Sequence, residues 1–237
     1  MLALLSRLRG IPDCLLCNGA GDGSLPICHA CENELPWLGA HCEICAVPLP
    51  ERGLVCGQCL RPPAFARVEA PWRYGFPVDG LITRFKHQAR WPLGRLLADL
   101  LAQHLQHAYS EGLPKPDLLL PVPLSRKRLR ERSFNQAEML SGWLAHSLNL
   151  AHDTRWLLRP QDTAHQQDLD AVARQRNLRR AFALSSRAQV QGRHLALVDD
   201  VLTTGATAEA IARLLRKAGA ERVDIYCLAR TPKPGEH

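Results

Sequence analysis

The chain has 237 residues, of which 46% are hydrophobic, and a formal net charge of +7. This hydrophobic fraction excludes an intrinsically disordered protein, and the length suits one full domain plus a smaller one. No apolar run approaches the ~20 residues of a membrane span, and the first ten residues place arginines after the apolar residues, the wrong order for a secretion signal. We therefore expect a cytoplasmic protein without membrane insertion.

The positive charge is unevenly divided along the chain. Residues 1–63 carry four lysines and arginines against six acidic residues, a net charge of −2, whereas the remainder carries twenty-six against seventeen, a net charge of +9. The basic charge of the larger part favours a phosphate-rich partner, either a small phosphorylated metabolite or a nucleic acid. An ordinary solvated basic surface is the alternative.

Eight of the nine cysteines form four CxxC pairs, with ten residues between each pair and the next. Two such pairs supply the four thiolates of a tetrahedral zinc site, so the spacing predicts two structural zinc ions in a domain over 1–63. We expect neighbouring pairs to share one zinc, with an interleaved pairing as the alternative. The predicted ligands are Cys14, Cys17, Cys28, Cys31, Cys42, Cys45, Cys56 and Cys59.

Other uses of these cysteines fit less well. A disulfide framework requires export from the reducing cytosol, and thioredoxin-like redox pairs belong on βαβ units rather than on a regular ladder. His29 and His41 adjoin ligand cysteines but are expected to be bystanders, and Cys227 lies in an apolar run typical of a buried strand.

Beyond a boundary at residues 61–65, strands and helices are predicted to alternate through a second domain, 64–237. This alternation is typical of a parallel α/β sheet, whose ligands bind beyond the carboxyl ends of the strands. Strands are predicted over 72–76, 117–124, 155–158, 194–200 and 222–229, and helices over 77–88, 92–108, 134–148 and 206–217.

The segment LALVDDVLTTGATAEA (195–210) joins a buried strand to a helix through a hydroxyl-rich turn. Backbone N–H groups of such a turn and of the helix N-terminus point at one small volume and favour an anion there. Threonine hydroxyls add donors, and Gly205 allows close approach of the backbone. The spacing and the lysine of a Walker loop are missing, so the turn predicts a different kind of phosphate site.

Asp199 and Asp200 precede this turn. Carboxylates repel a phosphate, so they need another partner, and ribose hydroxyls or a magnesium ion are suitable. A phosphorylated ribose satisfies both parts of the segment. A turn with only a structural role is the alternative.

Four apolar residues followed by DD and TTGAT resemble the signature of the type I phosphoribosyltransferases, which bind phosphoribosyl pyrophosphate (PRPP) and Mg²⁺. The resemblance implies that Asp199 and Asp200 hold the ribose hydroxyls. It also implies that the following backbone wraps the 5′-phosphate through Val201, Leu202, Thr203, Thr204, Gly205, Ala206 and Thr207.

Further segments resemble the ComF/GntX family, and the match extends from Cys14 to about Arg230. They are the cysteine pairs, FKH (85–87), PVPLSRKRLRERSFNQAEML (121–140), AF (181–182) and the spaced residues Arg159, Thr163, Gln166, Leu169, Arg174 and Asn177. The family implies a zinc-binding N-terminus fused to a phosphoribosyltransferase-like domain, with a role in natural competence. Its implied partners are PRPP, single-stranded DNA and the competence helicase or uptake machinery, and the oligomeric state is left open.

The resemblance also assigns roles around the pyrophosphate. Arg128, Arg132, Asn135 and Gln136 are expected to surround it, because guanidinium groups suit a dianionic load. Ser133 stands where the family usually has glycine, in RGFNQ. The alternative for this stretch is a solvated basic turn or a nucleic-acid patch.

A loop over residues 159–177 is expected to close over PRPP and exclude water, with Arg174 stabilising charge at the reacting carbon. A disordered surface loop is the alternative. Lys86 is expected to reach the same pyrophosphate, and otherwise it is one more exposed lysine. The predicted catalytic residues are Asp199, Asp200, Arg174 and Lys86.

Two functions follow from these residues. The first is an enzyme that transfers a phosphoribosyl group from PRPP to a nitrogen nucleophile with Mg²⁺. The second is a non-catalytic competence factor whose zinc ribbons and basic patch bind single-stranded DNA, with PRPP as a ligand or signal or with no part in its function. In the second, an aromatic cluster near the domain junction either stacks on bases or closes an interface. The cluster consists of Trp37, Phe65, Trp72 and Tyr74.

Overall fold

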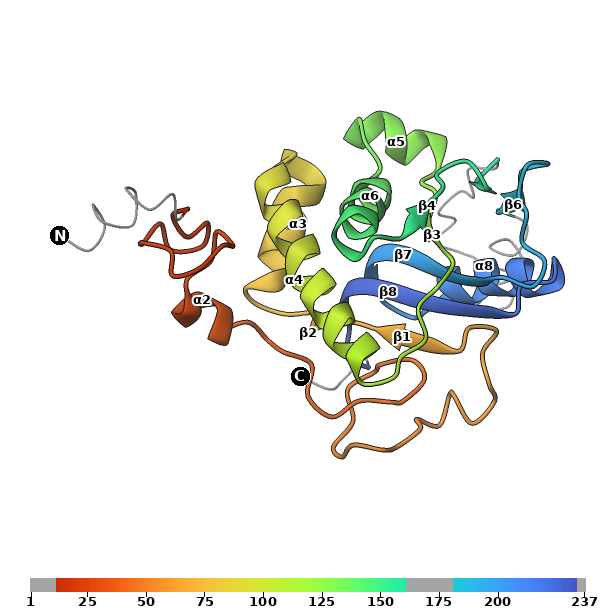
Figure 1. The fold of residues 1–237 in the computed structure, drawn as a ribbon, viewed down its shortest axis with the longest axis horizontal. Coiled ribbons are helices and arrows are strands. Elements are labelled where there is room, and N and C mark those ends of the chain that lie inside the picture. Colours follow the sequence, from red (N-terminus) through yellow and green to blue (C-terminus); the bar gives the residue numbers. More distant parts are fainter. Residues whose placement is uncertain (1–11, 161–180, 234–237) are drawn as a thin grey trace, which may run out of the picture.

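The fold is built on one parallel sheet, shown in Figure 1 by a computed structural model that describes residues 12–160 and 181–233. The strand order is β1-β8-β7-β3-β4, and β2 also pairs with β8. All of these pairings are parallel, which confirms the predicted α/β class. The strands are Arg67–Glu69 (β1), Trp72–Arg73 (β2), Leu118–Pro121 (β3), Ala151–His152 (β4), His194–Leu202 (β7) and Arg222–Arg230 (β8).

Helices cover both faces of this sheet (Figure 1). Apolar side chains alternate along β7, so that Leu195 and Leu197 join one hydrophobic cluster and Ala196 and Val198 join the other. This is the pattern of a strand buried on both faces. The cluster that contains Ala196 and Val198 includes residues of helices Val78–Gln88 (α3), Trp91–Ser110 (α4) and Gln136–Leu148 (α6). The cluster that contains Leu195 and Leu197 includes residues of Ala206–Lys217 (α8).

The cysteine-rich N-terminal region forms two ribbons that pack on opposite sides of the sheet. The first ribbon, residues 14–31, contains the start of a short helix, His29–Asn33 (α2), and contributes Cys14 and Ile27 to the cluster of α3 and α4. The second ribbon, residues 42–59, contributes its four cysteines to the cluster of α8. In Figure 1 the chain passes from the first ribbon, in red, to the second ribbon beneath β1.

The shortest elements were not predicted. β1 and β4 have three and two residues, too few to show a periodicity. Leu157–Leu158 (β5) falls within a predicted strand, but it pairs antiparallel with Ala183–Leu184 (β6) in a separate two-stranded sheet. A helix, Arg126–Arg132 (α5), occupies the stretch treated as a basic turn, because the Ser125 hydroxyl caps it by accepting the Arg128 N–H at 3.3 Å.

Two of the four residues of the aromatic cluster at the junction are buried, and Tyr74 is half-buried. Trp72 has no exposed surface and Phe65 very little, while Trp37 is 43% exposed. The Trp37 and Trp72 rings lie 5.7 Å apart. Trp72 and Phe65 therefore close the interface between the ribbons and the sheet, and they do not present a surface for base stacking.

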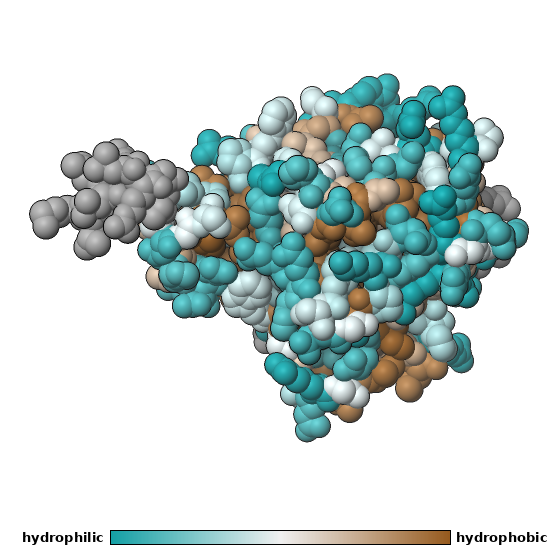
Figure 2. Space-filling model, in the orientation of Figure 1, coloured by the Kyte–Doolittle hydropathy of each residue, from teal (hydrophilic) through white to brown (hydrophobic). Residues whose placement is uncertain are grey.

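Among the described residues, no helix combines the length and the apolar character needed to cross a bilayer. The face of the molecule shown in Figure 2 is hydrophilic over most of its area, with hydrophobic residues in separate patches. Cys227 is fully buried in β8, as predicted.

Candidate functional site

The site is built where β3 and β7 end. The two strands pair in parallel, with Pro121 opposite Val198, and the Val122 N–H donates to the Val198 carbonyl at 2.9 Å. The segment that leads from β3 into α5 therefore lies beside the acidic residues that follow Val198. This edge is where parallel α/β sheets bind their ligands.

Asp199 and Asp200 lie near the end of β7 and differ in their surroundings. Asp200 is 4% exposed, and its Oδ2 atom lies 2.9 Å from Lys86 Nζ. Its N–H donates to Asp199 Oδ1 at 2.8 Å. Burial, and next the Asp200 carboxylate, raise the pKa of Asp199 to about 7, against the opposing charges of Lys86 and Arg128. Asp200 is therefore paired with a lysine, whereas Asp199 gains its proton near neutral pH.

Lys86 reaches this pair from the last turn of α3. The preceding residue, Phe85, is fully buried, and its ring centroid lies 5.8 Å from that of Phe134 and 5.9 Å from that of Trp143. A Cβ atom at Gly94 would lie 2.5 Å from the Phe85 ring, so the absence of a side chain there allows α3 and α4 to pack closely. This packing fixes the end of α3 and brings Lys86 to the edge of the sheet.

Residues 203–207, here called the phosphate turn, lie at the surface beyond β7. Thr203 and Thr204 are exposed, and Thr207 is half-buried. Gly205 is the N-cap of α8 with φ +76°, a conformation that residues with a Cβ adopt at a cost. The turn therefore places the side chains of Thr203 and Thr204 at the surface beside the N-terminus of a twelve-residue helix, and the Ala206 N–H donates to the Thr204 hydroxyl at 3.4 Å.

The residues predicted to hold pyrophosphate lie on α5 and at the start of α6. Arg128 and Arg132 are partly exposed on α5, and the charge of Arg128 acts on Asp199. Asn135 caps α6, because its Oδ1 accepts the Ala137 N–H at 3.1 Å while its Nδ2 donates to the Val122 carbonyl at 3.1 Å. Gln136 is buried. The structure therefore brings Arg128 toward the acids, and Asn135 holds the segment in place.

Arg174 and most of the predicted loop lie outside the described residues. At the near end of that segment, the Arg159 guanidinium lies 5.2 Å from the centroid of the Phe182 ring. The role of Arg174 stays a prediction.

The cysteines form two groups of four, Cys14–Cys17–Cys28–Cys31 and Cys42–Cys45–Cys56–Cys59, as expected from the pairing of neighbours. Within each group the Sγ atoms all lie within 4.8 Å of one another, and those of Cys45 and Cys56 are 3.7 Å apart. A tetrahedral site with metal–sulfur distances of about 2.3 Å has sulfur–sulfur edges of about 3.8 Å, so both groups fit zinc. His29 and His41 belong to neither group.

One thiol in each group has a lowered pKa, whereas the pKa values of Cys17, Cys31, Cys45 and Cys59 are raised. Burial raises the pKa of the Cys42 thiol, but N–H groups of Cys56, Cys45 and Ile44 outweigh it and bring the pKa down to about 7. Backbone N–H groups lower the pKa of Cys14 in the same way, against burial, to about 6. A thiolate is the form that binds a metal.

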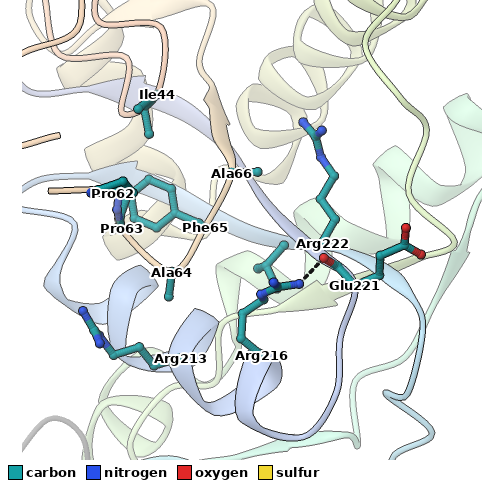
Figure 3. A pocket seen from close by; sticks show the side chains of 11 residues that line it. Ile44, Pro62, Pro63, Ala64, Phe65, Ala66, Arg213, Arg216, Glu221 and Arg222 are labelled. Carbon is teal, nitrogen blue, oxygen red and sulfur yellow. Dashed lines mark hydrogen bonds between the residues drawn. The ribbon is translucent and has the colours of Figure 1, made fainter. Parts of the chain in front are cut away.

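A hollow of about 590 Å³ lies at the opposite edge of the sheet, where the segment after the second ribbon meets the start of β8 (Figure 3). Phe65, Arg213 and Arg216 line it, and Arg216 donates to the backbone carbonyl of Glu221. None of the residues predicted to bind PRPP lines this hollow.

Sequence reasoning missed Arg230, which contacts the phosphate turn from behind. Its Nη1 atom donates to the carbonyls of Leu202 and Thr203. The available signal was a charged residue directly after the apolar run IYCLA, a position where a buried strand ends.

Family models match both parts of the chain. Residues 11–60 match the family described as double zinc ribbon domain, and residues 157–237 match the family described as phosphoribosyl transferase domain. Among solved structures, an adenine phosphoribosyltransferase is 18% identical with a TM-score of 0.40, covering 62% of this chain and 74% of that chain. The glutamine PRPP amidotransferase of B. subtilis is 20% identical with a TM-score of 0.39, covering 56% of this chain and 25% of that chain.

Curated relatives match over most of their length. DNA utilization protein YhgH of Salmonella typhi is 40% identical over 207 residues, which cover 86% of this chain and 90% of that protein. Competence protein F of Haemophilus influenzae is 35% identical over 220 residues, covering 91% and 90%. Competence protein ComFC of Bacillus subtilis is 25% identical over 214 residues, covering 86% and 84%. These identities, together with the double zinc ribbon and the phosphoribosyltransferase domain, show that the chain belongs to the ComF/GntX family of competence proteins.

Proposed function

We propose that the chain binds PRPP with Mg²⁺ at the end of β7 and transfers its phosphoribosyl group to a nitrogen nucleophile, as part of DNA uptake. One observation carries the proposal: two carboxylates at the end of a buried parallel strand lead directly into an exposed, hydroxyl-rich turn that begins a helix. The carboxylates suit ribose hydroxyls and the turn suits a phosphate.

Each part of the site would perform one task. The phosphate turn would bind the 5′-phosphate through N–H groups and threonine hydroxyls. Asp199 would accept hydrogen bonds from the ribose once it is ionised, and Asp200 is paired with Lys86. Arg128 and Arg132 would bind the pyrophosphate, with Mg²⁺ supplying further positive charge when bound. Pyrophosphate would leave with the bonding electrons as the nucleophile bonds to the anomeric carbon.

The N-terminal region supports this site without taking part in chemistry. Two zinc ions, one per group of four cysteines, would stabilise the ribbons, because a closed shell of four thiolates leaves no position for water. Reduced thiols of this kind fit the cytoplasm. The proposal keeps the division of the chain into 1–63 and 64–237, with the ribbons as the smaller domain.

Calorimetric titration of PRPP and Mg²⁺ into the zinc-loaded protein tests the proposal. We expect saturable binding that Asp199→Asn and Asp200→Asn each weaken at least about tenfold, the loss expected when a hydrogen bond to a charged group is removed. The matched control is Asp117→Asn, which lies at the other edge of the sheet and accepts the His194 N–H at 2.8 Å. An amide oxygen preserves that contact, so this variant should bind PRPP as the unchanged protein does.

Pyrophosphate release then separates the two functions. Release that depends on an added base, amine or nucleic acid supports the enzyme. Tight PRPP binding without turnover supports the binding protein. Absence of PRPP binding refutes the enzyme and a role of PRPP as a signal, and leaves DNA binding to the separate oligonucleotide test.

The second candidate function, binding of single-stranded DNA, is favoured by two exposed aromatic residues outside the buried cluster. Phe76 is 88% exposed before α3, and Trp91 is 52% exposed at the start of α4, next to the exposed Arg90. Aromatic faces beside arginines suit unstacked bases. Binding of an oligonucleotide that weakens with salt and with Trp91→Ala would support it.

A further inference from the structure

Arg230, the last residue of β8, is buried where three segments meet. It is 5% exposed. Its Nε donates to the carbonyl of Cys45 in the second ribbon at 2.9 Å. Its Nη1 donates to the carbonyls of Leu202 at 3.1 Å and Thr203 at 2.5 Å, where the phosphate turn begins. One side chain therefore connects a CxxC segment of the second ribbon to the turn.

The charge of this guanidinium is not neutralised by its neighbours. Its Nη1 atom also donates to the carbonyl and hydroxyl of Thr231. Within 12–160 and 181–233 no carboxylate forms an ion pair with it. A buried cation bound only to neutral carbonyls favours a nearby anion. Arg230 therefore holds the backbone of the turn and also adds positive potential behind it.

A second contact joins the same region to the other side of the turn. The Ala64 N–H, beyond the second ribbon, donates to Glu209 Oε2 in the first turn of α8 at 2.8 Å. Glu209 Oε1 also lies 2.5 Å from Arg213 Nε. The strand end and the helix start that flank the phosphate turn are thus both fixed from the side of the second ribbon.

We propose that Arg230 is a positioning residue through which the second ribbon, with its metal bound, sets the geometry of the phosphate turn and its affinity for PRPP. In the described part of the chain, the first ribbon makes no hydrogen bond to residues 199–207, and its buried residues belong to the other hydrophobic cluster, which contains no residue of the phosphate turn. The statement about PRPP rests on the proposed function, whereas the coupling between ribbon and turn does not.

Hydrogen exchange on the full-length zinc-loaded protein measures the coupling without any ligand. Arg230→Met keeps most of the side-chain volume and all eight ribbon cysteines, so two zinc ions should stay bound. We expect exchange of peptides covering 199–210 to rise at least about tenfold, since hydrogen bonds from a charged donor are lost. Arg230→Lys, with its single nitrogen, should recover part of the protection.

Arg222→Met is the matched control, at the other end of the same strand. Arg222 Nε lies 3.0 Å from both oxygens of the buried Asp224 and contacts no part of the turn. This variant should lose stability without a selective rise over 199–210. A selective rise in both variants, or in neither, would overturn the proposal.

The two ribbons provide the second comparison. Cys45→Ser should raise exchange over 199–210, whereas Cys17→Ser should raise it only within residues 14–31. In an Arg230→Met background, Cys45→Ser should add a clearly smaller change at 199–210, because only the connection through Ala64 and Glu209 remains. An undiminished effect of Cys45→Ser in that background would overturn the role of Arg230.

PRPP affinity, measured on the same variants, adds the functional readout. We expect Arg230→Met to raise the dissociation constant about tenfold and Arg230→Lys to raise it less. Exchange over 199–210 could rise in Arg230→Met but not in Arg222→Met while neither the variants nor the unchanged protein bind PRPP. In that case the coupling holds and the proposed function fails. If PRPP binds with equal affinity to all of them, Arg230 has no positioning role.

Discussion

Asp199 and Asp200 are adjacent in sequence, yet the fold gives them different surroundings. Asp200 has the ammonium group of Lys86 at 2.9 Å. For Asp199, burial and the Asp200 carboxylate raise the pKa from 3.8 to about 7. A ligand that needs both carboxylates ionised must therefore remove a proton from Asp199 when it binds below this pH.

The raised pKa of Asp199 makes stability depend on pH. Between about pH 4 and pH 7 the folded state keeps a proton that the unfolded chain releases, so the free energy of unfolding falls as pH rises through this range. Asp199→Asn keeps an oxygen that can accept the Asp200 N–H and removes the titration. In urea unfolding, we expect the variant to be more stable than the unchanged protein at pH 8, by up to about 4 kcal/mol, and equally stable at pH 4. The same pH dependence in both proteins would contradict the raised pKa.

At the scale of single elements, α5 shows how a short helix shapes the pyrophosphate side of the site. It has seven residues, begins at the Ser125 cap and ends at Ser133, which has φ +64°. A non-glycine residue in this left-handed conformation is strained by about 1 kcal/mol. Glycine, which the family usually has at this position, adopts this conformation without strain. This chain forms the same turn with a serine.

Substitution of Ser133 tests the strain at the end of α5. We expect Ser133→Gly to raise the free energy of unfolding by about 0.5 kcal/mol, because relief of strain exceeds the added entropy of the unfolded chain. Ser133→Val should lower it by about 1–2 kcal/mol, because a β-branched side chain tolerates positive φ poorly. Ser133 is exposed, so neither change removes a buried contact. Equal stability of the two variants in urea would refute the strain.

At the scale of the whole molecule, the ribbons are unequal parts of the fold. All four cysteines of the second ribbon are buried and share a hydrophobic cluster with α8. In the first ribbon, Cys17 is exposed and only Cys14 is fully buried. The second ribbon is therefore part of the core, whereas the first lies at its margin.

Loss of each metal site should therefore have a different effect on stability. We expect Cys59→Ser to lower the free energy of unfolding by at least about 4 kcal/mol, in the range of the largest single-residue losses, and Cys17→Ser to lower it clearly less. Zinc content by mass spectrometry should show two ions in the unchanged protein and one in Cys17→Ser. A larger loss for Cys17→Ser than for Cys59→Ser would show that the ribbons contribute in the reverse order.

The sequence alone determined the features that depend on local spacing. Four CxxC pairs predicted two groups of four cysteines, because neighbouring pairs in short turns meet first. The run from 194 to 217 predicted a buried strand, a turn and a helix, since apolar periodicity and glycine act over a few residues. The family resemblance rested on the same local motifs.

Only the tertiary structure decided the contacts that join distant segments. β1 is too short to recognise without its partner β8. The approach of Lys86 to Asp200 depends on how α3 and α4 pack, and the contacts of Arg230 join β8 to the second ribbon and to the phosphate turn. Burial sets the protonation of Asp199. Such features depend on which distant segments pack together and bury one another from water. That packing is a property of the folded chain and not of any one segment.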